Sequence, residues 1–338
     1  MKKIYKIYLS YYCYILFFPM LMLLNLFIMM STSWFSMWMI MEINMISFIS
    51  LIIFDKFIKK ESLMGYFLIQ TFNSYLFLFF LILMNYLNIN NFKFLIFLSM
   101  MTKLGLPPFY QWYLKMMNNL NWMNIFILST MQKFIPLFIM NSFIINNNLI
   151  LIILLILSNY SSIKGMNLTN LKIIMSYSSM IQITWIITIM MISEMSWMIY
   201  FKIYTFIMLT ISMIFYQYEL NYLNLLNMMK LEKMMKFYLM CLSIFSLASM
   251  PPMYGFLMKF SALIILTNYY SYIYIYMLII SSLISMYFYL RMLFSTIMMN
   301  SYSIKLNWWN LNFKNKMNYK IFILIWLNFM MLMLMEMI

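Results

Sequence analysis

The chain has 338 residues, of which 66% are hydrophobic and 9% charged, and its mean hydropathy is +0.89. A soluble protein would carry about a quarter charged residues, so the composition excludes an ordinary soluble domain. It predicts an all-α, polytopic membrane protein. The net charge of +15 would suggest a nucleic-acid partner in a soluble chain. Here the lysines lie in short connections between apolar runs, which fits membrane topology and contact with lipid headgroups and predicts no nucleic-acid partner.

Apolar runs of about 20 residues recur along the chain and predict eleven membrane-spanning helices. Their expected ranges are about 8–30, 34–54, 62–84, 92–115, 121–140, 148–164, 172–192, 196–216, 237–266, 272–295 and 319–337. If every helix crosses once, the lysine-rich connections fall on one side of the membrane. By the positive-inside rule the N-terminus then faces the matrix or cytoplasm, and the C-terminus faces the other side.

The fourth predicted span contains a lysine and two helix breakers, because Lys103 stands four residues before Pro107 and Pro108. Proline lacks an N–H group and its ring clashes with the preceding turn, so this helix is expected to break. In lipid, a broken helix is tolerated only where protein or a water-filled cavity satisfies the freed carbonyls. The stretch therefore predicts an ion site.

A second double proline, Pro251 and Pro252, lies in the ninth predicted span and is followed by Lys259. The two double prolines are 144 residues apart. Interrupted spans at corresponding places in two halves are typical of transporters built from repeats. We therefore predict a single transmembrane domain over 1–338. It would hold two inverted five-helix repeats, at about 8–140 and 148–295, and a C-terminal helix at about 319–337.

Four ionisable residues, Glu42, Lys103, Lys133 and Lys259, are expected near the middle of the membrane. From the nearest polar edge, a rise of about 1.5 Å per residue places each of them roughly 12–16 Å deep. Any one of the lysines could instead extend to the interface or pair with Glu42 for a structural purpose. Lys202 is expected to be such an interfacial lysine, because no helix breaker or partner accompanies it.

Several motifs are spread along the chain in one order: Trp38–Phe48, Lys103–Phe109, Gln132–Pro136, Gly165–Thr169, Ser176–Ser179, Trp185 and Pro251–Lys259. Together they resemble the antiporter-like membrane subunits of respiratory NADH dehydrogenase (complex I), in particular the animal mitochondrial type. No single motif would suffice, but their order, the length and the number of spans agree.

The resemblance implies a subunit that translocates protons across the mitochondrial inner membrane, with its N-terminus in the matrix and its C-terminus in the intermembrane space. It implies that Glu42 and Lys103 form an interacting pair, that Lys133 is the central relay, and that Lys259 lies toward the exit. The implied partners are other complex I membrane subunits, including neighbouring antiporter-like ones, and membrane lipids.

The sequence also departs from the family, because Tyr110 and Gln182 stand where histidines are usual. With no histidine and only two cysteines, Cys13 and Cys241, zinc, haem and iron–sulfur sites are not expected. We therefore expect no cofactor and no redox chemistry in this chain. NADH, FMN, iron–sulfur clusters and ubiquinone are expected elsewhere in the complex. A stand-alone cation/proton antiporter of the same fold and a purely structural membrane subunit are the alternatives.

Overall fold

The computed structural model describes residues 2–53, 59–87, 92–143, 148–228, 234–251 and 253–307. The predicted C-terminal helix and Pro252 lie outside these ranges. The described helices, with one short 3-10 helix, η1, are α1 (Lys2–Met30), α2 (Trp34–Ile53), α3 (Lys60–Leu87), α4 (Phe92–Leu104), α5 (Gln111–Asn119), α6 (Trp122–Ser129), α7 (Met131–Ser142), α8 (Asn148–Gly165), α9 (Leu171–Met190), α10 (Glu194–Tyr218), η1 (Leu223–Met228), α11 (Met234–Leu247), α12 (Tyr254–Thr267) and α13 (Tyr272–Asn307).

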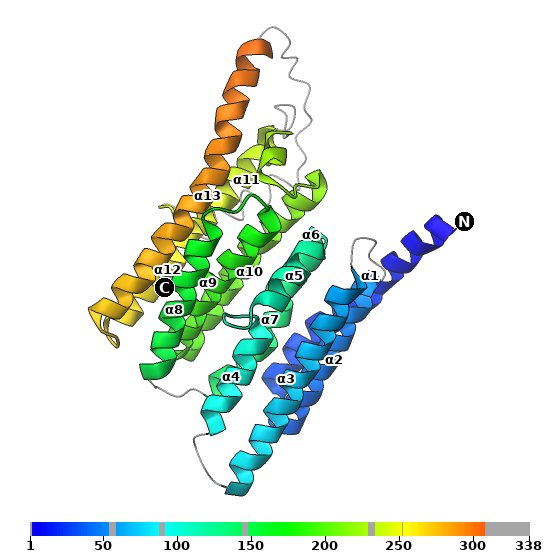
Figure 1. Cartoon of the computed structure of the whole chain (residues 1–338), viewed down its shortest axis with the longest axis vertical. Helices are drawn as coiled ribbons and strands as arrows, with labels where there is room; N and C mark the ends of the chain where they lie inside the picture. Colours follow the sequence, from blue (N-terminus) through cyan, green and yellow to red (C-terminus); the bar gives the residue numbers. More distant parts are fainter. Residues whose placement is uncertain are drawn as a thin grey trace. The chain divides into compact units, whose positions relative to one another are not determined.

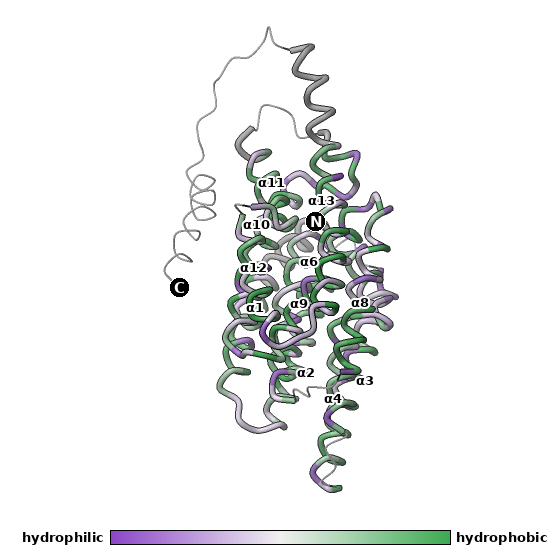
Figure 2. Tube along the Cα trace, turned by 90° about the vertical axis from the view of Figure 1, so that its left-hand side faces the viewer, coloured by the Kyte–Doolittle hydropathy of each residue, from purple (hydrophilic) through white to green (hydrophobic). Residues whose placement is uncertain are grey.

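The all-α, polytopic fold class is confirmed. Among the described residues, eight helical segments are long and apolar enough to cross a membrane, and each matches a predicted continuous span. The other two predicted spans within the described residues are the two with double prolines. They are divided as expected, one into α4 and α5 and the other into α11 and α12. Figure 2 shows that apolar residues run along the helices.

The chain forms two compact units, the first within Met1–Leu157 and the second within Ser158–Ile338. The division falls inside α8, whereas the predicted second repeat begins with this helix. The repeat boundaries and the inversion of one repeat relative to the other stay predictions. Each unit contains one of the two broken spans.

In the first unit, α1, α2 and α3 run side by side, and α3 also packs against α4 and α5 (Figure 1). Helix α7 contacts α1, α2, α4 and α6, so it is the inner helix of this unit. Apolar side chains such as Met41, Phe48 and Ile139 fill the space between these helices. A side chain on the inner face of α7 is therefore removed from lipid as well as from water.

In the second unit, α9 takes the inner place, with α10, α12 and α13 packed against it. Nearly all of its residues are buried, and its centre contains the small polar residues Ser176, Ser178 and Ser179 beside Trp185. The hydroxyls of these serines return to the carbonyl of the preceding turn, as in Ser178 to Met175 at 2.8 Å. This lets the helix carry polar residues without exposing them.

Candidate functional site: buried lysines beside two helix breaks

The first helix break begins with Gly105, directly after α4. Its φ of +70° is in the left-handed region, which favours glycine. The Leu106 N–H donates to the Met101 carbonyl at 3.3 Å, and the Gly105 N–H donates to the Thr102 carbonyl at 3.2 Å. These two bonds form a Schellman motif, a common way to end a helix. Pro107 and Pro108 follow and prevent the helix from continuing.

Side chains donate to two backbone carbonyls in the last turn of α4. The Trp112 indole Nε1 donates to the Thr102 carbonyl at 3.1 Å, and the Gln70 Nε2 donates to the Lys103 carbonyl at 3.2 Å. Both donors come from neighbouring helices, α5 and α3. Protein side chains thus supply hydrogen bonds to the carbonyls beside the break, which is one of the two arrangements that the sequence predicts for a broken helix in lipid.

The second break has the same backbone arrangement. Ser249 has a φ of 56° and lies 144 residues after Gly105 (249 − 105). Its N–H donates to the Ser246 carbonyl at 3.1 Å, while the Met250 N–H donates to the Phe245 carbonyl at 3.2 Å. The double proline that begins at Pro251 follows at once. Two distant segments of the chain therefore end a helix in the same way before a double proline.

Lys103 is on the last turn of α4, and its side chain is only 8% exposed. Its ammonium donates to the Met41 sulfur at 3.5 Å, although a thioether is a weak acceptor. Met41 is followed on α2 by the half-buried Glu42. The predicted pairing of Glu42 with Lys103 stays a prediction, since the hydrogen bond of the Lys103 ammonium is to Met41.

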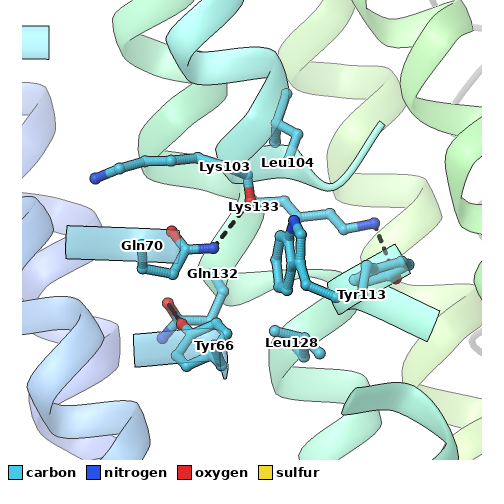
Figure 3. Close-up of a pocket in the computed structure, with 9 residues that line it drawn as sticks. Tyr66, Gln70, Lys103, Leu104, Tyr113, Leu128, Gln132 and Lys133 are labelled. Atoms are coloured by element: carbon cyan, nitrogen blue, oxygen red, sulfur yellow. Dashed lines mark hydrogen bonds between the residues drawn. The ribbon is translucent and has the colours of Figure 1, made fainter. Parts of the chain in front are cut away.

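Lys133 is on α7 and is 2% exposed. Its ammonium donates to the Tyr113 hydroxyl at 2.9 Å and lies 4.3 Å from the centre of the Tyr113 ring. In Figure 3 the side chains of Lys103 and Lys133 point in opposite directions, with Lys133 directed toward Tyr113. Each ammonium thus has its own surroundings, although both lysines line the same cavity.

This cavity has about 10 Å³ of space for the centre of a water molecule, which is room for about one water. Its polar lining includes the side chains of Tyr66, Gln70 and Gln132 together with the two lysines. A water there would have hydrogen-bond partners on several sides. The cavity is therefore suited to hold a single water in a space that both lysines line (Figure 3).

An amide pair joins the helix of Glu42 to the helix of Lys133. The Asn44 Nδ2 donates to the Gln132 Oε1 at 3.0 Å, and the Gln132 Nε2 donates to the Asn44 Oδ1 at 3.2 Å. The Tyr66 hydroxyl donates to the same Gln132 oxygen at 3.3 Å. Because Asn44 follows Glu42 by two residues and Gln132 precedes Lys133, this network holds α2, α3 and α7 in register at the site.

Lys259 lies in the second unit, on α12, and is 7% exposed. Its ammonium is buried and has no hydrogen-bond partner among the described residues. A buried, unpaired charge is costly, so this position is unfavourable for a purely structural lysine. By contrast, Lys202 on α10 is exposed. The predicted set thus divides into Glu42, Lys103 and Lys133 in the first unit and Lys259 in the second.

Some features of the site were not predicted. Tyr66, Gln70 and Tyr113 were not among the candidates, because a tyrosine or glutamine in an apolar run gives no distinctive spacing. The fifth span is also interrupted at Thr130, whose φ and ψ of −122° and −74° separate α6 from α7. The sequence held one signal of irregular helix geometry in this span. Pro136 has no N–H to donate to the Gln132 carbonyl four residues earlier.

The two positions that depart from the family have different surroundings. Tyr110 precedes α5 and is half-buried. Gln182 is buried on α9, and its Oε1 accepts a hydrogen bond from the Tyr200 hydroxyl at 2.6 Å. A tyrosine therefore supplies the polar partner at the second position.

Residues 31–285 match the family model described as NADH:quinone oxidoreductase/Mrp antiporter, transmembrane. The chain belongs to this family. Among its relatives, NADH-ubiquinone oxidoreductase chain 2 of Anopheles gambiae is 34% identical over 302 residues, covering 85% of this chain and 86% of the relative. The chain 2 protein of Locusta migratoria is 32% identical over 290 residues, covering 82% and 85%.

The fold of this antiporter-family chain is also found in solved structures. A chain of respiratory complex I from Thermus thermophilus superposes with a TM-score of 0.71 at 14% identity, covering 77% of this chain and 64% of that one. A chain of the Mrp complex from a Dietzia species gives 0.66 at 12% identity, covering 76% and 55%. This chain therefore spans less than two thirds of each of these two, and the likeness shows the fold alone.

Proposed function

We propose that this chain is a membrane subunit of respiratory complex I, of the chain 2 type, and that it translocates protons across the mitochondrial inner membrane. The observation that carries the mechanism is the burial of Lys103 and Lys133 around a water-sized cavity beside a broken helix. Membership of the complex is supported by the 34% identity to the chain 2 protein of Anopheles gambiae. The N-terminus would face the matrix and the C-terminus the intermembrane space.

The proposed step is proton transfer from the Lys103 ammonium to a neutral Lys133 amine through one water in the cavity, toward which both side chains turn from the positions seen in Figure 3. An N–H bond of Lys103 breaks as the water accepts the proton, and another proton of the water forms the new N–H bond on Lys133. The water is unchanged at the end, and the charge has moved from α4 to α7. In this proposal Glu42 controls the first half of the step, because a nearby carboxylate favours the charged form of a lysine.

In this proposal, approach of the Glu42 carboxylate to the Lys103 ammonium acts as a switch. At an effective dielectric of about 20, two unit charges about 4 Å apart attract by roughly 4 kcal/mol, which corresponds to about three units of pH. Moving or neutralising Glu42 would therefore release the proton of Lys103. Lys259 would serve the second unit, toward the exit or the next antiporter-like subunit.

Electron transfer would take place outside this chain. NADH, FMN, the iron–sulfur clusters and ubiquinone are proposed to lie in other subunits of the complex. Neighbouring membrane subunits and lipids would cover its apolar outer surface. The chain would then contribute proton movement alone, driven by redox chemistry elsewhere.

The first test is fractionation of membranes solubilised in mild detergent on a native gel, with the chain located by peptide mass spectrometry. We expect it to migrate with the large band that oxidises NADH. Migration as a small species away from that activity would contradict membership of the complex. The chain would then be better explained as a stand-alone cation/proton antiporter, since a chain of the Mrp complex has the same fold.

The second test replaces the buried lysine by an apolar side chain of similar length. In complex I assembled with Lys103→Met, we expect proton translocation to slow by about 10²-fold or more, the range typical of lost proton-transfer groups. The matched control is Lys202→Met, because Lys202 is also a helical lysine but is exposed. If assembled complex I with Lys103→Met translocates protons at the rate of the unaltered complex, the role given to Lys103 is refuted.

A further inference from the structure

The Tyr113 side chain is fully buried and contacts Lys133 in two ways. Its hydroxyl accepts a hydrogen bond from the ammonium at 2.9 Å, and its ring centre is 4.3 Å from the same nitrogen. A cation within about 6 Å of an aromatic ring centre is attracted by the ring's electron-rich face. Hydroxyl and ring thus act together on one charge.

These two contacts respond differently to the charge of Lys133. The attraction to the ring requires the ammonium and is lost when the amine is neutral. The hydroxyl can accept from an ammonium and donate to a neutral amine, but a hydrogen bond to a charged group is the stronger of the two. Tyr113 therefore holds the protonated form of Lys133 more firmly than the neutral form.

The attraction of Tyr113 for the Lys133 ammonium is directed away from Lys103. Both lysines line the water-sized cavity, but their side chains point in opposite directions, and Tyr113 is on the side toward which Lys133 points (Figure 3). We propose that Tyr113 is a positioning residue that draws protonated Lys133 away from Lys103 and so opposes return of the proton. This proposal rests on the proton-transfer step of the proposed function.

The helix break is shaped to bring Tyr113 to this place. A Cβ atom on Gly105 would lie 2.7 Å from the Tyr113 Cβ and 3.1 Å from Trp112 Cζ2. Only a glycine therefore allows the start of α5 to pack so closely against the end of α4. The same glycine ends α4 two residues after Lys103, so one residue helps to position both the first lysine and the tyrosine.

The experiment compares complex I assembled with Tyr113→Phe with the unaltered complex. In proteoliposomes, the number of protons translocated per electron is measured as a function of pH. Phenylalanine retains the ring and removes the acceptor for the ammonium, so the pH at which translocation falls should decrease by about one to two units. Tyr113→Leu removes the ring as well and should shift the profile further. Besides Tyr113, the titratable groups that line the cavity with Lys133 are Tyr66 and Lys103, and both are unchanged.

The matched control is Tyr274→Phe. Tyr274 is also buried, and its hydroxyl has no hydrogen-bond partner among the described residues. The number of protons translocated per electron by the Tyr274→Phe complex should depend on pH as it does in the unaltered complex. If the pH profile of Tyr113→Phe also overlays that of the unaltered complex, the role of Tyr113 is refuted.

A third variant, Lys133→Met, separates this inference from the proposed function. Loss of translocation in Lys133→Met with an unchanged Tyr113→Phe profile would overturn the role of Tyr113 alone. Native translocation in Lys133→Met would overturn the proposed function.

A structural measurement decides the matter if Tyr113→Phe does not assemble. Cryo-EM maps of the unaltered complex at about pH 5 and about pH 10 would locate the Lys133 side chain. We expect it against Tyr113 at the lower pH and displaced toward the cavity at the higher pH. The same position against Tyr113 at both values would refute the proposal.

Discussion

Gly255, in the first turn of α12, is the position where a single methyl group should cause the greatest disturbance. A Cβ atom there would lie 1.5 Å from the Ser246 carbonyl oxygen, a backbone atom of α11 that cannot rotate away. Since real contacts of this kind are not shorter than 3.0 Å, the ends of α11 and α12 would have to separate by roughly 1.5 Å. Overpacking a core costs about 1–3 kcal/mol when side chains can adjust, so we expect Gly255→Ala to cost about 3 kcal/mol or more.

The assay is the yield of assembled complex I on a native gel, followed by the temperature at which the purified complex loses NADH:quinone activity. Gly65→Ala is the matched control, because nothing lies within 4 Å of the added Cβ atom on α3. Alanine is favoured over glycine inside a helix by about 1 kcal/mol, so this control should assemble normally. We expect little or no assembled complex with Gly255→Ala. Equal yields and equal inactivation temperatures for the two variants would refute the close packing of α11 against α12.

Two further predictions concern the second break and the amide pair. Ser249→Gly should stabilise the chain by about 1 kcal/mol, because the left-handed backbone conformation is costly for a residue with a Cβ atom; an unchanged or lower inactivation temperature would contradict it. Asn44→Ala and Gln132→Ala should be coupled, since polar contacts between membrane helices contribute about 0.6 kcal/mol on average and at most about 1.7 kcal/mol. A double-mutant cycle of denaturation measures this coupling, and strictly additive effects would show that the pair is not formed.

The positions of the spans could be predicted because lipid imposes a simple rule. Every backbone N–H and carbonyl in the membrane must be satisfied within the protein, so each crossing requires a long apolar helix. The two interruptions could be predicted for the same reason, since proline cannot donate a hydrogen bond. Both double prolines follow a helix end within a few residues, at Leu104 and Leu247.

The partners at the site could not be predicted from the sequence. Apolar residues follow Lys133 along α7 on more than one face, so its spacing does not indicate which way its side chain points. Tyr113 was indistinguishable from an ordinary packing residue, and its role depends on the positive φ of Gly105 eight residues earlier. The interruption at Thr130 was also hidden, because threonine is compatible with a helix and the nearest proline, Pro136, lies six residues further along, inside α7.

The two lysines stand on different sides of their breaks. Lys103 lies in the helix before its break, and Lys259 lies in the helix after its break. Lys103 is in the last turn of α4, where the partial negative charge of the helix end stabilises a cation by about 0.3–1 kcal/mol at a surface and up to about 2 kcal/mol when partly buried. Lys259 lies in the second turn of α12 (Tyr254–Thr267), beyond the first turn to which the effect of a helix beginning is confined. The ammonium of Lys103 donates to the Met41 sulfur, whereas the ammonium of Lys259 has no hydrogen-bond partner among the described residues. The helix end therefore supports a charge on Lys103 and gives no such support to Lys259, a difference that follows from the side of the break on which each lysine stands.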